Sequence, residues 1–185
     1  MAANLRLLNY LSPGLPVALF EGFAEYLEQT LGLEVALFHE SRFSGPPPDA
    51  ANPFVSGQVD AAFMCAPPFF WSLEAGVPVE LLGVAPTFDD PRTQRKPVYF
   101  ADVVTRADSS AKTFAELRGG VWAYNDTCSL SGYYCLLEHL YTLGEDRTFW
   151  GRLITSGSHG ASLELVLSGS ASAAAIDSTL CSQDG

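Results

Sequence analysis

The sequence is poor in positive charge. It has 10 lysines and arginines against 21 aspartates and glutamates, which gives a net charge of −11. Such a chain repels the phosphates of nucleic acids and the headgroups of anionic membranes, so neither is an expected partner. A small anion would have to be held by local geometry, because the overall field of the chain opposes it.

Long hydrophobic runs are also missing. No apolar stretch is long enough to cross a bilayer, so direct membrane insertion is not expected. The first residues, MAANLRLLNYLSPG, lack the basic start, apolar core and cleavage site of a secretory signal. The chain as given is therefore expected to be cytoplasmic, or periplasmic or extracellular if it is a processed form.

The four cysteines form no metal or disulfide pattern. Cys65, Cys128, Cys135 and Cys181 include no C-x-x-C pair and have no zinc spacing with the three histidines. We expect buried thiols, no metal site and no cofactor. Cys65 and Cys128 stand at predicted strand–helix turns, where a thiol pKa can fall, but no general base is evident beside them. No catalytic residue is therefore expected.

What the sequence does contain is an alternation of strand and helix patterns. Its 185 residues, 48% hydrophobic and 17% charged, suit a globular protein with one large domain or two small lobes. The alternation predicts an α/β protein with mainly parallel sheets. Strands are expected at 6–12, 34–38, 60–64, 79–85, 98–105, 121–124, 153–155 and 173–176, and helices at 16–31, 50–56, 69–75, 113–119, 132–143 and 161–167.

The pattern divides into two α/β lobes joined near residues 86–98. We assign residues 1–97 to lobe 1 and residues 98–177 to lobe 2. The connecting loop carries Arg92, Arg95 and Lys96, three of the ten basic residues. We interpret it as a solvated connection in preference to a lip that captures anions.

Two loops of the second lobe are candidate anion sites. The stretch from Val121 to Tyr134, VWAYNDTCSLSGYY, passes from an apolar strand through hydroxyl-rich residues into a helix, and the loop SGSHG at 156–160 does the same. Backbone N–H groups and the positive end of the helix dipole converge at such turns. The alternative for each loop is a serine that caps only its own helix.

Several short motifs occur in a particular order along most of the chain, from Leu7 to Asp177. They are Asp60-Ala-Ala-Phe-Met-Cys-Ala, Tyr99-x-x-x-Val103-Val104, Ser129-x-Ser131-Gly132-Tyr133, Gly157-Ser158-His159 and Ala173-Ala174-Ala175-Ile176-Asp177. This order resembles the phosphonate-binding proteins of ABC importers, which belong to the type 2 periplasmic binding protein superfamily. The resemblance implies two lobes that close over a small oxyanion, such as a phosphonate or phosphate ester, without catalysis. It also implies an ABC importer membrane subunit as a partner if the protein is exported.

The resemblance further implies roles for particular residues. Ser129, Ser131 and the amide of Gly132 would bind the oxyanion, and His159 would add a donor. The remaining implied ligand-binding positions are the pocket aromatics Tyr99 and Phe43, the ligand-amine position Asp177, and Ala66 in the small-residue turn after a strand.

Three features depart from the family pattern. Leu130 replaces the middle hydroxyl of a common Ser-Thr-Ser turn, and Phe43 stands where a tyrosine is frequent. The chain also stops at Gly185, soon after the strand from which a type 2 binding protein returns to its first lobe. We therefore interpret residues 178–185 as the start of that crossing and expect the fold to lack the full return segment.

Two other functions stay open. An enzyme on the same scaffold, of the pyrimidine-precursor synthase or lyase type, would use cysteine and histidine in the cleft. The absence of a paired acid and base in the sequence counts against it. A cytosolic ligand-sensing module is the other alternative, suggested by the missing export signal and the incomplete return crossing.

Overall fold

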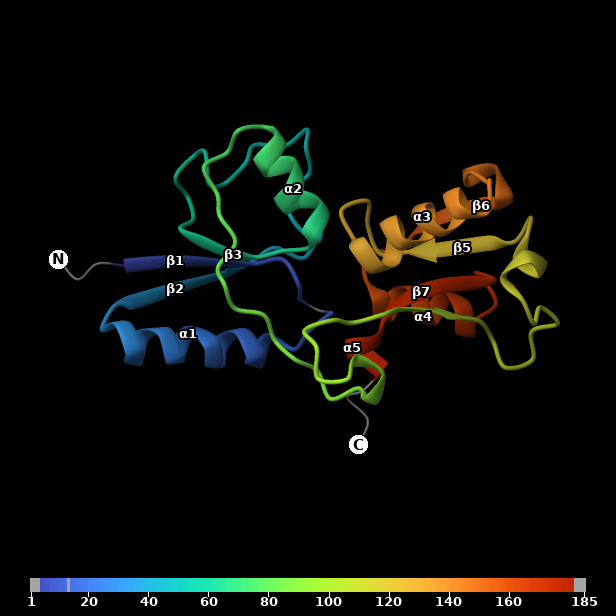
Figure 1. Ribbon diagram of the computed structural model, residues 1–185, viewed down its shortest axis with the longest axis horizontal. Coiled ribbons are helices and arrows are strands. Elements are labelled where there is room, and N and C mark those ends of the chain that lie inside the picture. Colours follow the sequence, from blue (N-terminus) through green and yellow to red (C-terminus); the bar gives the residue numbers. More distant parts are fainter. Residues whose placement is uncertain (1–3, 13, 182–185) are drawn as a thin grey trace. The chain divides into compact units, whose positions relative to one another are not determined.

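The computed structural model describes residues 4–12 and 14–181, which belong to two compact units (Figure 1). Unit 1 is Met1–Leu82 and unit 2 is Gly83–Gly185. Residues 83–97, assigned to lobe 1 from the sequence, are thus grouped with unit 2. Part of the reason is that the guanidinium of Arg92 binds Asp102 of unit 2. The last four residues of the expected return crossing, 182–185, lie outside the described residues.

Unit 1 is built on a three-stranded parallel sheet with the order β2-β1-β3. Figure 1 shows α1 and α2 on opposite sides of this sheet. The elements are β1 (Asn4–Asn9), α1 (Val17–Leu31), β2 (Glu34–His39), β3 (Ala61–Phe63) and α2 (Ala66–Glu74).

Helix α1 has the ends that its sequence predicts. Pro16 is its N-cap, where a missing N–H costs nothing. Gly32 ends it in the left-handed conformation, at φ 65°, and donates its N–H to the carbonyl of Glu28. Phe20 and Ala24 are its buried residues.

Two elements predicted for lobe 1 are wrong. The expected helix at 50–56 is a series of turns, because the side chain of Asn52 accepts a hydrogen bond from the backbone N–H of Phe54 and so competes with helical pairing. The expected strand at 79–85 is not formed either. Within the described part of the chain no strand pairs with it, and an extended segment without a neighbouring strand forms no inter-strand hydrogen bonds.

Unit 2 is built on a four-stranded sheet with the order β4-β7-β5-β6. β5 pairs in parallel with β6 and β7, and β4 pairs with β7 in antiparallel fashion. The prediction of an α/β fold with mainly parallel sheets is confirmed. The strands and α-helices are β4 (Ala101–Val104), β5 (Val121–Tyr124), α3 (Cys135–Thr142), β6 (Arg152–Thr155), α4 (His159–Leu167), β7 (Ala173–Asp177) and α5 (Ser178–Cys181).

The sheet of unit 2 is covered on both faces. Successive strand residues point to opposite faces, so neighbours such as Trp122 and Ala123 enter different hydrophobic clusters. Leu136 and Leu140 of α3 belong to the Trp122 cluster, and Val166 of α4 belongs to the Ala123 cluster. Unit 2 is therefore a three-layer α/β/α structure.

Three cysteines can be assigned from the structure. Cys65, Cys128 and Cys135 take part in no disulfide, and of these three only Cys128 is fully buried, so the expectation of buried thiols holds for Cys128 and not for Cys65 or Cys135. The side chain of Cys181 lies outside the described residues. Among the residues that are described, none of the helices has both the length and the apolar character needed to span a bilayer.

Candidate functional site

The turn after β5 is held by buried polar side chains. The carboxylate of Asp126 accepts a hydrogen bond from the backbone N–H of Cys128 at 2.7 Å and another from the Asn125 side-chain amide at 3.1 Å. Both Asn125 and Asp126 are more than 90% buried. This Asx turn ends the strand and aims the following residues toward a helix start.

Ser129 is the N-cap of the next segment, a π-helical turn over Leu130–Tyr134. Its hydroxyl accepts a hydrogen bond from the Gly132 N–H at 3.1 Å. The Gly132 amide, expected to bind an oxyanion, is therefore already engaged by the cap. Single π-helical turns within helices are frequent at functional sites.

Gly132 is required at its position by close packing. A Cβ atom there would lie 2.0 Å from Oδ1 of Asn125 and 3.3 Å from Cε1 of His159. Its φ is not positive, so the requirement is steric and not conformational. The glycine lets the turn approach both Asn125 and the loop that carries His159.

The two predicted anion loops meet inside unit 2. The hydroxyl of Ser131 lies 3.3 Å from Nε2 of His159, and both residues are more than 90% buried. His159 is the first residue of α4, and Ser158 caps that helix by accepting a hydrogen bond from the Ala161 N–H at 3.0 Å. Ser129 and Ser158 thus cap their own helices, whereas Ser131 and His159 contact each other.

Burial lowers the pKa of His159 below its usual 6.5. Asp177, the backbone of Ala175 and Asp126 oppose this shift in part. Nδ1 of His159 is buried and has no partner with hydrogen-bond geometry in the described part of the chain. The imidazole is therefore neutral at pH 7.

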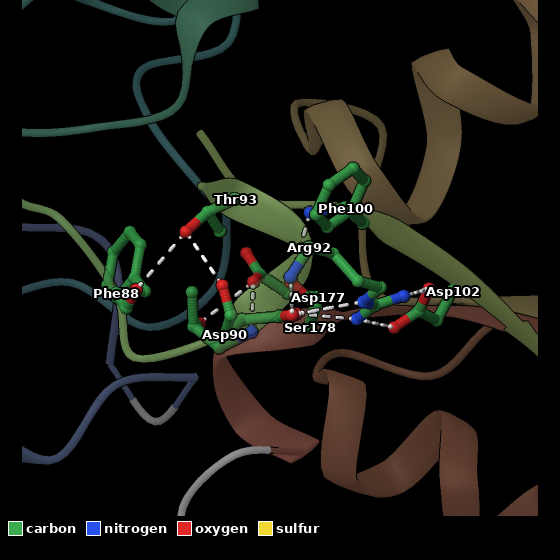
Figure 2. Close-up of polar contacts among 9 residues, drawn as sticks. Phe88, Asp90, Arg92, Thr93, Phe100, Asp102, Asp177 and Ser178 are labelled. Atoms are coloured by element: carbon green, nitrogen blue, oxygen red, sulfur yellow. Dashed lines mark hydrogen bonds and ion pairs between the residues drawn. The ribbon is translucent and has the colours of Figure 1, made fainter. Parts of the chain in front are cut away.

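Asp177 caps the short helix α5. Its carboxylate accepts hydrogen bonds from the backbone N–H and the hydroxyl of Thr179, at 2.9 and 2.8 Å. Next to it, Ser178 exchanges two hydrogen bonds with the backbone of Phe100, beside β4 (Figure 2). Tyr99 is half-buried and directly precedes this junction.

The basic loop before β4 has its own acidic partners. Figure 2 shows the guanidinium of Arg92 between the carboxylates of Asp90 and Asp102, with contacts of 2.7 Å to each. Arg92 also lies 4.6 Å from the centre of the Phe100 ring. Hydrogen bonding to Arg92 lowers the pKa of Asp90. Arg92 is thus committed to the junction between the loop and β4.

The remaining predicted site residues lie in unit 1. Phe43 is half-buried in the loop after β2, and Ala66 is the first residue of α2, which Cys65 precedes in an extended conformation. The other six predicted residues belong to unit 2. A shared site for Phe43, Ala66 and the unit 2 residues stays a prediction.

Two cavities of unit 2 lie elsewhere. A groove of about 510 Å³ runs between β6 and α4 and reaches Ser156, and a cavity of about 270 Å³ lies between β4 and α3. Neither is lined by Ser131 or His159. Within residues 4–12 and 14–181, no group of three or more histidine, cysteine, aspartate or glutamate side chains is placed to hold a metal ion.

Asn125 and Asp126 were missed as site-shaping residues. The sequence shows them as an Asn-Asp pair that ends an apolar strand, which is a turn signal with no long-range information. Their importance comes from the contact with Gly132 and from burial, and both are properties of the folded unit.

A family model described as the periplasmic substrate-binding protein of the phosphonate ABC transporter matches residues 7–183. The chain belongs to this family. The resemblance drawn from its motifs is therefore confirmed, and the family is one of periplasmic ligand-binding proteins. No curated protein matches the chain with significance.

Solved structures of such binding proteins share the fold. The chain is similar to a binding protein of an ABC phosphonate transporter from Pseudomonas aeruginosa, with 17% identity, a TM-score of 0.70, and coverage of 96% of this chain and 58% of that one. It is also similar to the periplasmic aliphatic sulphonate binding protein SsuA from Escherichia coli, with 20% identity, a TM-score of 0.63, and coverage of 94% of this chain and 50% of that one. A third similar structure is PhnD1 from Prochlorococcus marinus in complex with methylphosphonate, with 16% identity, a TM-score of 0.63, and coverage of 96% of this chain and 65% of that one.

These comparisons establish a type 2 periplasmic-binding-protein fold for the chain. They also show that the chain spans only half to about two thirds of the length of the structures it matches. In the described residues the parallel strands of the two units have the same relative order, β2-β1-β3 in unit 1 and β6-β5-β7 in unit 2.

Proposed function

We propose that this chain binds a small oxyanion, a phosphonate or a phosphate ester, without converting it chemically. The site would lie between the two units and use Ser131 and His159 as its central contacts. Tyr99, Phe43 and Ala66 would line it.

The observation that carries the proposal is the contact between Ser131 and His159. Two loops that start different helices bring a hydroxyl and a neutral imidazole within 3.3 Å of each other. An oxyanion that replaced this internal hydrogen bond would accept one bond from each side chain. Charge-assisted hydrogen bonds contribute about 1.5–3 kcal/mol each, and they act locally against the overall negative charge of the chain.

Family membership supports the cellular role. We infer that the protein works outside the cytoplasm as the substrate-binding component of an ABC importer and passes its ligand to a membrane subunit. The support is the family description together with the methylphosphonate bound in PhnD1 and the sulphonate named for SsuA.

Titration calorimetry of the intact chain tests this proposal. The ligands are methylphosphonate, a phosphate monoester, an alkyl sulfonate and acetate. We expect saturable binding of methylphosphonate or the monoester, and unchanged ligand when the solution is then inspected by phosphorus NMR. No saturable binding of any ligand by folded protein would refute the proposal, and steady conversion of the monoester would favour an enzyme instead.

A pair of serine variants locates the site. Ser131→Ala should weaken binding by about 1.5–3 kcal/mol, because it removes one charge-assisted donor. Ser172→Ala is the matched control: Ser172 accepts a hydrogen bond from the N–H of Val121, at the opposite end of β5. Ser129→Ala added to Ser131→Ala also removes the N-cap, so it should lower stability as well as affinity. Equal affinities for Ser131→Ala and Ser172→Ala would place the ligand elsewhere.

A further inference from the structure

The contact between Ser131 and His159 offers hydrogen-bond donors that carry no charge. Ser131 has a hydroxyl, and burial keeps the imidazole of His159 neutral at pH 7. The hydroxyl of Ser129 already accepts a hydrogen bond from the Gly132 N–H, and Leu130 adds no polar group. Neutral donors can bind an anion, but they leave its charge uncompensated.

The turn that holds these donors also contains a buried carboxylate. Asp126 is 4% exposed, and its carboxylate accepts hydrogen bonds from the N–H of Cys128 and the side-chain amide of Asn125. Oδ1 of the same Asn125 side chain lies so close to Gly132 that it would overlap a Cβ atom there. A single side-chain amide therefore separates the carboxylate of Asp126 from the turn of the proposed site.

A second carboxylate lies at the end of the neighbouring strand. The parallel register pairs Trp122 of β5 with Ala173 of β7, and continuing it places Asp126 and Asp177 at corresponding positions. Burial lowers the pKa of His159, and the carboxylates of Asp177 and Asp126 oppose that shift, which indicates that both act on the imidazole.

Most arginines of the chain have partners of their own. Arg147 lies over the ring of Tyr133, 5.3 Å from its centre. Ion pairs with aspartate or glutamate hold a further set of arginines, which are Arg6, Arg42, Arg92, Arg106 and Arg118. A ligand at Ser131 and His159 would thus meet neutral donors with two carboxylates close behind them.

We propose that the site at Ser131 and His159 selects the singly charged form of its oxyanion. This inference rests on the proposed function and specifies the ligand further: a phosphonate or phosphate monoester would bind with one acidic proton still attached. A second negative charge on the ligand would be repelled by Asp126 and Asp177, and a buried environment screens that repulsion only weakly. A singly charged ligand accepts the same hydrogen bonds with less repulsion.

Titration calorimetry of the intact chain between about pH 7 and 9 tests the proposal, with methyl phosphate and methanesulfonate as probes. A phosphate monoester loses its second proton near pH 6, so its singly charged fraction falls about tenfold for each further pH unit. Methanesulfonate keeps one charge throughout. Because the pKa of His159 is below 6.5, its imidazole stays neutral in this range. We expect the Kd of methyl phosphate to rise about tenfold per pH unit and that of methanesulfonate to stay constant.

An aspartate variant tests the source of the repulsion. In Asp126→Asn the Kd of methyl phosphate at about pH 9 should be at least about fivefold lower than in the parent chain, with a smaller change for methanesulfonate. Asp146→Asn is the matched control, because Asp146 also accepts a hydrogen bond from a backbone N–H, that of Thr148, at the start of another helical turn. It should leave both Kd values unchanged. The pH series on the parent chain needs no variant.

The outcomes separate this inference from the proposed function. A Kd of methyl phosphate that stayed constant or fell as pH rose would overturn the selectivity and leave the proposed function standing. Equal Kd values of methyl phosphate for folded Asp126→Asn and Asp146→Asn would also overturn it, because the buried carboxylate would then not repel the ligand. Absence of binding of either probe, and of every ligand named for the proposed function, would overturn that function and this inference with it.

Discussion

The two units build the same arrangement of parallel strands but pack it differently. Two hydrophobic clusters among the described residues lie in unit 2, where Trp122, Phe149 and Trp150 are almost completely buried. In unit 1 the largest such side chain is Phe20, and its neighbour Phe23 is 38% exposed. Strand order therefore does not decide how much core a unit of this fold obtains.

The difference follows from what lies beside the third strand. In unit 2, β4 covers the edge of β7, and Ala101 and Val104 extend the two clusters. In unit 1 the corresponding edge of β3 has no partner among the described strands, and Leu19, Phe23 and Tyr26 of α1 are exposed. In unit 2 the strand beside β7 thus adds side chains to both hydrophobic clusters.

The largest expected effect is on the core of unit 2. Trp122→Ala should destabilise that unit by about 3–5 kcal/mol, because it empties a fully buried site between α3 and the sheet. Phe20→Ala in unit 1 should cost less, since partly exposed neighbours can move into the space. Urea unfolding followed by hydrogen exchange in each unit measures the loss in free energy of unfolding for both variants. A larger loss for Phe20→Ala than for Trp122→Ala would contradict the comparison of the two units.

The next effect concerns the close approach at Gly132. Gly132→Ala should destabilise unit 2 by about 1–3 kcal/mol, because the new methyl group overlaps Asn125. Gly160→Ala is the matched control: it lies in α4, its nearest neighbour would be 3.9 Å away, and alanine favours helix by up to about 1 kcal/mol. The thermal unfolding temperature should therefore fall for Gly132→Ala and rise for Gly160→Ala. Equal shifts would contradict the packing role of Gly132.

Protonation of His159 should give unit 2 a pH dependence. Burial lowers the pKa of His159 in the folded state, so the unfolded chain binds the proton first as pH falls. The free energy of unfolding of unit 2 should be constant above about pH 6.5 and should decline below it, until the pKa of His159 in the folded state is reached. Urea midpoints of unit 2 measure this decline, and His159→Gln should flatten it. A decline of the same size in the variant would assign the effect to other groups.

The smallest effect is expected at the surface of unit 1. Hydrogen bonding to Arg6 lowers the pKa of Asp60 to about 2, so the pair stabilises the unit above pH 4 and is lost as pH falls through about 2. Both side chains are more than a third exposed, which limits the contribution to about 1 kcal/mol or less. Urea unfolding of Asp60→Asn against the parent chain should differ at pH 5 and converge near pH 2. A constant difference would show that charge is not its cause.

Local signals in the sequence predicted many of the elements. Pro16 and Gly32 bracket α1 because their backbone preferences act wherever they occur. The errors at 50–56 and 79–85 arose where a side chain or a missing neighbour overrides local pattern. Asn52 bonds to the backbone in one case, and no strand of the described chain pairs with the segment in the other.

The site was only partly accessible to sequence reasoning. The two serine-rich helix starts were visible as candidates, and the structure shows that Ser129 and Ser158 cap their own helices. The contact between Ser131 and His159 joins residues 28 positions apart and depends on the glycine that lets the turns approach. A single sequence contains no distance information of that kind.

The most direct test of the proposed site is an NMR titration of the His159 imidazole in the intact chain, over about pH 5 to 8, with and without methylphosphonate. A bound anion stabilises the imidazolium, so the pKa of His159 should rise from its lowered value and its Nε2 resonance should shift on binding. If methylphosphonate bound saturably while the pKa and ring resonances of His159 stayed unchanged, the oxyanion would not bind at Ser131 and His159.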